Sequence, residues 1–99
     1  MKKYDVIFTD EANDDFKSIA KYISLDNPYK SLAFVSELQN TTTQTLSFFP
    51  RKYSKYKSSH IFPYKSYLVI YDIDEAENSV YVLSIANSSE YTKYSKYLS

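Results

Sequence analysis

The sequence predicts a small α+β domain in which two helices pack on one sheet. Three observations predict it: an alternating apolar segment opens the chain, two segments of helical periodicity follow, and β-branched and aromatic residues dominate two later runs. The expected order is an N-terminal strand, an antiparallel two-helix hairpin and a three-stranded antiparallel run that completes the sheet. A chain of 99 residues is the size of one domain, so we expect residues 1–99 to form a single unit.

The first strand and first helix are predicted from the N-terminal quarter of the chain. Tyr4, Val6 and Phe8 fall on one side of an alternating segment, which is typical of a half-buried strand. Thr9 is a suitable N-cap, and the acidic residues after it favour the positive end of a helix dipole. Apolar residues at helical spacing predict one buried stripe, formed by Ala12, Phe16, Ile19, Ala20 and Ile23.

A second helix is predicted to begin at Asn27-Pro28, with Asn27 as the cap and Pro28 in the first turn. Threonines in its middle have weak helical propensity, so we expect tertiary packing to stabilise it. Pro50 ends it, and the short link between the helices predicts an antiparallel hairpin. Its apolar face is predicted to comprise Leu32, Val35, Leu38, Thr42, Leu46 and Phe49.

The second half of the chain predicts three strands separated by polar segments. After a basic connector, the expected elements are a short strand at Ile61-Phe62, a turn at 63–66, strands at Tyr67–Ile73 and Val80–Ala86, and a polar turn at Asp74–Ser79 between them. Residues 88–99 form a polar tail. It either docks as a short helix or becomes ordered by a partner.

Composition excludes several classes of function. The chain has no Cys, which excludes disulfides and thiolate metal sites and favours a reducing cytoplasm. It has no Gly, which excludes glycine-rich phosphate-binding loops and the G-x-S-x-G nucleophile motif. Its single histidine, His60, argues against a histidine-based zinc site. These exclusions lead us to expect no metal and no cofactor. No stretch is long and apolar enough for a membrane span or a signal peptide, so we also expect no membrane association.

The basic connector is the best chemical candidate. Net charge is zero, with 12 basic and 12 acidic side chains, but this segment contains no acid. Its cations could bind phosphates and its tyrosines could stack on unpaired bases. The alternative is a solvated loop whose lysines provide solubility. The candidate target-binding or nucleic-acid-binding residues are Arg51, Lys52, Tyr53, Lys55, Tyr56 and Lys57.

A series of short motifs runs through residues 3–90 in a characteristic order: Tyr4–Ala12, Ile19–Ile23, Asn27-Pro28, Phe34, Glu37-Leu38, Phe49-Pro50, Phe62-Pro63, Tyr67–Tyr71 and Val82–Ala86. Together they resemble the RelE/ParE toxins of bacterial type II toxin–antitoxin systems. The resemblance implies two helices on an antiparallel sheet and a cognate antitoxin whose tail wraps the toxin. A toxin–antitoxin hetero-oligomer, growth inhibition and plasmid stabilisation are the corresponding expectations.

The resemblance also implies one of two activities. RelE-like members cut messenger RNA, usually on the ribosome, whereas ParE-like members poison DNA gyrase. Nuclease members commonly supply an Arg before the Phe-Pro pair, a basic residue on the last strand, and a His or Tyr beyond it. Here His60, Ser84 and Asn87 stand at such positions. Tyr91 or Tyr94 could replace the terminal acid–base group, and Lys55 could supply a cation. The catalytic candidates are His60, Lys55, Tyr91 and Tyr94.

Three interpretations stay open. The altered catalytic positions favour a toxin that binds a target such as gyrase without chemistry of its own. A ribosome-linked endoribonuclease with a reduced set of groups is the first alternative, and a non-toxic binding domain of the same fold is the second. In each case we expect an apolar groove or sheet edge that an antitoxin helix or strand could fill.

Overall fold

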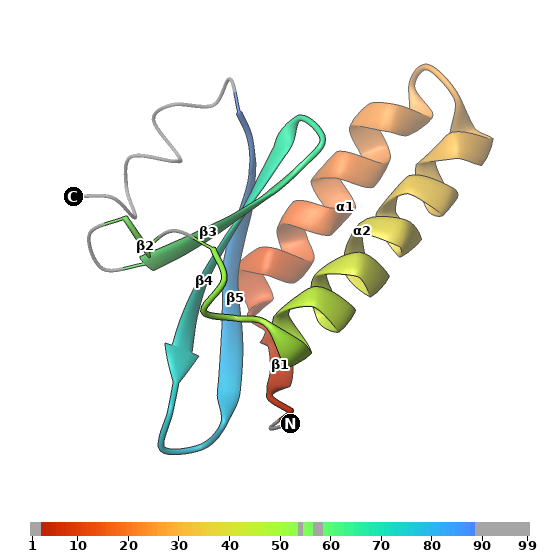
Figure 1. The fold of residues 1–99 in the computed structure, drawn as a ribbon. Coiled ribbons are helices and arrows are strands. Elements are labelled where there is room, and N and C mark those ends of the chain that lie inside the picture. Colours follow the sequence, from red (N-terminus) through yellow and green to blue (C-terminus); the bar gives the residue numbers. More distant parts are fainter. Residues whose placement is uncertain (1–2, 54, 57–58, 89–99) are drawn as a thin grey trace.

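The computed structural model describes residues 3–53, 55–56 and 59–88. Its elements are β1 (Asp5–Phe8), α1 (Asp10–Ser24), α2 (Pro28–Phe48), β2 (Lys55–Tyr56), β3 (Ser59–Tyr64), β4 (Tyr67–Asp74) and β5 (Ser79–Asn87). The two helices form a hairpin that covers one face of a single sheet (Figure 1). The α+β class, the helical hairpin and the predicted order of elements along the chain are confirmed, and β2 is an additional short strand. Most of the predicted tail, 89–99, lies outside the described residues.

The sheet is mixed rather than wholly antiparallel. Its strand order is β1-β5-β4-β3-β2, and β3, β4 and β5 are antiparallel neighbours as predicted. β1 pairs in parallel with β5, with Asp5 opposite Ser79 and Phe8 opposite Val82. The antiparallel sheet implied by the resemblance is therefore wrong at this edge. Two tight turns reverse the chain twice after β3, so β5 runs in the same direction as β3, and β1 shares this direction.

The sequence predicted β2 as part of a connector and placed the next turn too early. β2 pairs only with the first two residues of β3, and two residues are too few for a periodic pattern. β3 continues through Pro63 to Tyr64, which lies opposite Tyr67, so the turn contracts to Lys65-Ser66. Pro63 is tolerated because β2 does not reach it, and a strand edge without a partner needs no N–H there.

Both predicted helix caps are confirmed. The Thr9 hydroxyl oxygen accepts a hydrogen bond from the Ala12 N–H at 3.2 Å. Asn27 Oδ1 accepts from the N–H groups of Tyr29 and Lys30 at 3.1 and 3.2 Å, with Pro28 in the first turn. Each cap satisfies donors that have no partner within the helix. The threonine-rich middle of α2 is continuous helix and contributes the buried Thr42.

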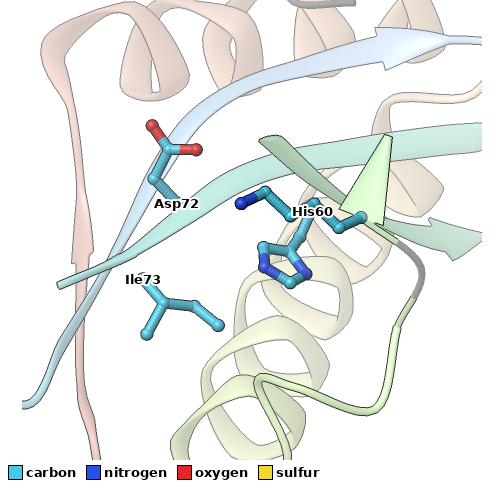
Figure 2. Close-up of a pocket in the computed structure, with 4 residues that line it drawn as sticks. His60, Asp72 and Ile73 are labelled. Atoms are coloured by element: carbon cyan, nitrogen blue, oxygen red, sulfur yellow. The ribbon is translucent and has the colours of Figure 1, made fainter. Parts of the chain in front are cut away.

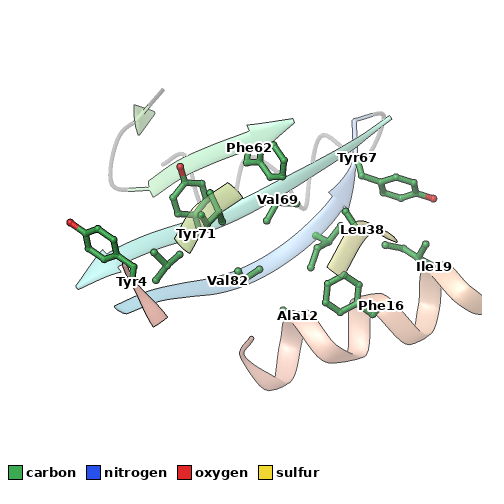
Figure 3. Packing of buried hydrophobic residues seen from close by; sticks show 13 residues of the cluster. Tyr4, Ala12, Phe16, Ile19, Leu38, Phe62, Tyr67, Val69, Tyr71 and Val82 are labelled. Atoms are coloured by element: carbon green, nitrogen blue, oxygen red, sulfur yellow. The ribbon is translucent and has the colours of Figure 1, made fainter. Parts of the chain in front are cut away.

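The core lies between the helices and the sheet (Figure 3). α1 contributes Phe16 and Ile19, and α2 contributes Leu38 and Leu46, as predicted; the facing strands supply Phe62, Tyr67, Val69, Tyr71, Val80, Val82 and Ile85. Within the described residues, neither helix is long and apolar enough to cross a membrane.

Two residues predicted for the core are exposed. Leu32 is 77% exposed because its neighbour Ser31 takes the buried position and donates its hydroxyl to the Ala20 carbonyl at 2.6 Å. Phe49 is 51% exposed. It caps the end of α2 with a non-helical φ of −133°, so helical periodicity no longer directs its side chain.

Asp15 of α1 forms hydrogen bonds to residues beside a bulge in β5. Ile70 lies opposite Ser84 and Tyr71 opposite Val82, so Leu83 is the extra residue. The Asp15 carboxylate accepts from the Ser84 hydroxyl at 2.7 Å and from the Ile85 N–H at 2.9 Å. Asp15 thus supplies an acceptor where the strand ladder is disrupted.

Candidate functional site

The basic connector contributes β2, which is one edge strand of the sheet. Arg51 and Lys52 follow the end of α2 and are exposed, while Lys55 lies in β2 directly opposite His60. The short β2–β3 pairing therefore brings together two of the catalytic candidates. Lys57, Tyr91 and Tyr94 lie outside the described residues, as does the side chain of Tyr56. Their proposed roles stay predictions.

A polar cleft lies where β2, β3 and β4 meet (Figure 2). Its volume is about 290 Å³, and its lining includes Lys55, His60, Asp72 and Ile73. A lysine, a histidine and an aspartate thus contribute to the lining, although the Asp72 carboxylate points away from the His60 ring in Figure 2. Sequence reasoning identified Lys55 and His60 as candidates and missed Asp72, which lies near the end of the predicted strand Tyr67–Ile73. Only the pairing of β3 with β4 reveals that His60 and the Tyr71-Asp72 pair are neighbours.

The imidazole of His60 is fixed on two sides. Its Nδ1 lies 3.2 Å from the carbonyl oxygen of Tyr53, and its ring stacks on Tyr71 with centroids 5.3 Å apart. A carbonyl oxygen can only accept, so the neutral ring keeps its proton on Nδ1 and leaves a lone pair on Nε2. The side chain is half-buried.

Tyr71 is the support beneath this imidazole. It is fully buried, and its hydroxyl donates to the Pro50 carbonyl at 2.7 Å. Burial, and secondarily the nearby Tyr53, raises the pKa of Tyr71 far above its usual value. Tyr71 therefore stays protonated at neutral pH and acts as a structural group rather than as an acid or base.

Asp72 supplies the opposite charge in the cleft. Its Oδ1 is shielded from solvent and accepts no hydrogen bond from any described residue. A shielded carboxylate oxygen without a donor is unfavourable, and a bound donor would relieve this cost. Among the described residues, no group of three or more His, Asp or Glu side chains could hold a metal ion.

Two other predicted binding residues already have partners. Arg51, the sole arginine of the chain, forms an ion pair with Glu75, which also accepts from the Tyr4 hydroxyl at 2.8 Å. The Tyr53 ring packs on Phe62 with centroids 4.8 Å apart. Phosphate binding by Arg51 would compete with Glu75, and base stacking by Tyr53 would compete with its packing.

The last strand contributes no cation at the position where nuclease relatives carry one. Ser84 is fully buried and is bonded to Asp15, and Asn87 is half-buried at the end of β5. The described part of the site can therefore accept a proton at His60 and bind an anionic group through Lys55. Of its cations, Arg51 is already paired with Glu75, whereas the exposed Lys52 and Lys55 belong to neither of the ion pairs found among the described residues.

Comparison with known proteins decides the family. A family model described as "ParE toxin of type II toxin-antitoxin system, parDE" matches residues 6–91. The chain belongs to the ParE toxin family. No curated protein sequence matches it.

Solved structures share the ParE fold. The chromosomal ParDE system of P. aeruginosa matches with a TM-score of 0.73 and 15% identity, over 86% of this chain and 96% of that one. The RelBE2 toxin–antitoxin complex of Mycobacterium tuberculosis matches with a TM-score of 0.64 and 22% identity, over 88% and 93%. The E. coli RelBE complex matches with a TM-score of 0.57 and 16% identity, over 85% and 95%. At these identities the likeness concerns the fold alone.

Proposed function

We propose that this ParE-family protein is the toxin of a type II toxin–antitoxin pair and acts by binding a protein target, DNA gyrase, rather than by cutting RNA. The observation that carries the proposal is the burial and hydrogen bonding of Ser84 on β5. This buried hydroxyl is committed to Asp15, so β5 offers no cation to a phosphate at this position. The ion pair between Arg51 and Glu75 supports the same conclusion.

The proposal includes a cognate antitoxin that neutralises the toxin in a hetero-oligomer in the cytoplasm. Support comes from the family and from neighbours that are themselves toxin–antitoxin complexes. Growth inhibition and plasmid stabilisation follow as the physiological roles of such a pair.

DNA supercoiling tests the proposed target. Purified toxin is titrated against gyrase and relaxed plasmid, with and without its antitoxin. We expect loss of supercoiling or accumulation of cleaved plasmid, reversed by the antitoxin. Undisturbed supercoiling at a large molar excess of folded toxin would remove gyrase as the target.

A ribosome-dependent endoribonuclease is the second candidate, and the cleft favours it. Within the described part of the chain nothing bonds to Nε2 of His60, and Lys55 lies opposite this residue on β2, which is a minimal arrangement for proton transfer next to a phosphate. A translating extract provides the test. Transcript cleavage that disappears in the His60→Ala, Lys55→Ala double variant would support this candidate over target binding.

A further inference from the structure

Two adjacent phenylalanines form an exposed pair at the end of α2. Phe48 is 44% exposed and Phe49 is 51% exposed, and their ring centroids lie 6.4 Å apart. Single exposed apolar residues are ordinary on a protein surface, but two aromatic rings in contact form a patch. The pair lies apart from the cleft and from a groove of about 450 Å³ between α1 and α2, whose lining includes Phe16, Lys17 and Val35.

The backbone holds both rings in position. Phe48 is the last residue of α2, and the Phe49 N–H donates to the Thr45 carbonyl at 2.9 Å. The Tyr4 N–H donates to the Ser47 carbonyl at 2.8 Å, so the residue before β1 is bonded to the last turn of α2 (Figure 1). Aromatic side chains on a rigid backbone lose little conformational entropy on binding, and such anchors contribute much of the energy of protein interfaces.

Cations lie around the pair. Lys3 Nζ lies 6.0 Å from the centroid of the Phe48 ring, and Arg51 and Lys52 come shortly after Phe49 in the chain. The Lys52 N–H donates to the Phe49 carbonyl at 3.2 Å, so the chain turns here and keeps Lys52 close to the pair. The two ion pairs found among the described residues involve neither Lys3 nor Lys52. Both lysines can therefore pair with acidic groups of a partner.

This surface already binds a carboxylate of the chain itself. Glu75, in the turn between β4 and β5, pairs with Arg51 and accepts from the Tyr4 hydroxyl at 2.8 Å. The side chains of this ion pair are 69% and 43% exposed, and exposed pairs contribute little stability, so a partner's carboxylate can compete with Glu75. The cations thus favour an acidic partner, and the aromatic pair favours one that carries apolar side chains.

The arrangement of the rings favours a protein over a nucleic acid as this partner. Unpaired bases stack on open, flat ring faces. Here the two rings are tilted against each other by 49°, and Lys3 lies over Phe48. The whole chain also has no excess of cations, which supply much of the affinity for nucleic acids.

We propose that the pair of Phe48 and Phe49, with Lys3 and Lys52 beside it, binds an acidic segment of the toxin's protein target. An apolar side chain of this segment packs on the two rings, and its carboxylates pair with the lysines. This inference rests on the proposed action on DNA gyrase and adds the surface of the toxin that contacts this target.

Binding of the purified toxin to immobilised gyrase holoenzyme provides the test. Affinity is measured for the wild-type chain, Phe49→Ser and Lys3→Glu, and inhibition of supercoiling is titrated in parallel. We expect Phe49→Ser to weaken binding about tenfold or more, because it removes an aromatic anchor but keeps the backbone bond to Thr45. Lys3→Glu should weaken it about three- to tenfold at low salt and less at high salt, because exposed charges are screened.

Two matched variants at the opposite end of α2 serve as controls. Tyr29→Ser removes an aromatic side chain that is 90% exposed, and Lys30→Glu reverses an exposed lysine. The helix has 21 residues, so its two ends lie about 30 Å apart. Both controls should bind gyrase within about twofold of wild type. Unchanged melting temperatures verify folding, and Lys3→Glu, at an exposed position, tests the surface even where Phe49→Ser is unstable.

The outcomes separate the two proposals. Gyrase binding that is unaffected by Phe49→Ser and Lys3→Glu, or equally reduced by the controls, overturns the surface and leaves gyrase as the target. Normal gyrase binding by variants that no longer bind the antitoxin, or single-stranded DNA, would give the surface a different partner and overturns the inference as well. A folded wild-type toxin that does not bind gyrase overturns both proposals.

Discussion

Asp15 has a structural role that its sequence position conceals. It follows three other acidic residues near the start of α1, where a favourable helix dipole is the obvious explanation. In the structure its carboxylate instead accepts from the Ser84 hydroxyl and the Ile85 N–H, at 2.7 and 2.9 Å. This single side chain connects α1 to the bulge of β5. It also accepts the hydrogen bond of Ser84, the residue at the position where nuclease members commonly carry a cation.

Asp15→Ala should therefore destabilise the fold. It removes the acceptor of two hydrogen bonds and leaves buried donors without this partner, at a cost of about 2–3 kcal/mol. Asp14→Ala, at the exposed neighbouring position, should change stability by less than about 0.5 kcal/mol. Urea unfolding of both variants measures the difference. Equal midpoints would mean that the Asp15 bonds contribute nothing net.

Tyr71 should make stability depend on pH in the alkaline range. Burial raises its folded pKa above the ordinary value of 10.0, so the folded state retains the proton longer than the unfolded state. Its contribution is complete below pH 10 and falls as pH rises, by at most about 1.4 kcal/mol per pH unit. Tyr71→Phe should give a shallower decline between about pH 10 and 11, together with a loss of about 1 kcal/mol at neutral pH. Parallel unfolding curves for the two proteins would contradict this assignment.

At the scale of elements, periodicity predicted the helices well and their faces less well. Thr9 and Asn27-Pro28 have local chemistry that determines where a helix begins, so both starts were predictable. Which residues of α2 meet the sheet depends on how α2 crosses α1. There Ser31 and Ala20 touch, and Leu32 is turned outward as a result. Helical spacing alone contains no information about that crossing.

Leu38 and Leu32 should respond very differently to truncation. Leu38 is fully buried in the core, so Leu38→Ala should cost about 2–5 kcal/mol. Leu32→Ala should change the free energy of unfolding by less than about 0.5 kcal/mol, because the side chain is 77% exposed. Chemical denaturation of the two variants checks this. A large loss at Leu32 would mean that α2 is rotated relative to the structure.

The strands were predicted where the apolar runs are long and were missed where pairing alone defines them. β4 and β5 contain long β-branched and aromatic runs, and their predicted bounds differ by only one residue at each altered end. β2 is a two-residue element that exists only because β3 lies beside it. The cleft depends on this pairing, which explains why Lys55 and His60 could be named as candidates but not joined to Asp72.

At the scale of the whole molecule, two surfaces of different chemistry lie on different layers. The helical layer presents an apolar groove with a basic rim, and the sheet edge presents a polar cleft with both signs of charge. Zero net charge gives no general attraction to RNA, since phosphate neutralisation by excess cations supplies much of such affinity. The neutral net charge therefore supports the proposed protein target rather than RNA. Sequence alone predicted the fold and the family but not this separation.

Controlled expression in bacterial cells tests the central claim most directly. The wild-type toxin and the His60→Ala, Lys55→Ala double variant are induced without antitoxin, while growth and transcript integrity are followed together. Target binding without RNA chemistry predicts that both proteins arrest growth and that transcripts remain intact. Cleaved transcripts with the wild type, and normal growth with a folded double variant, would contradict the account.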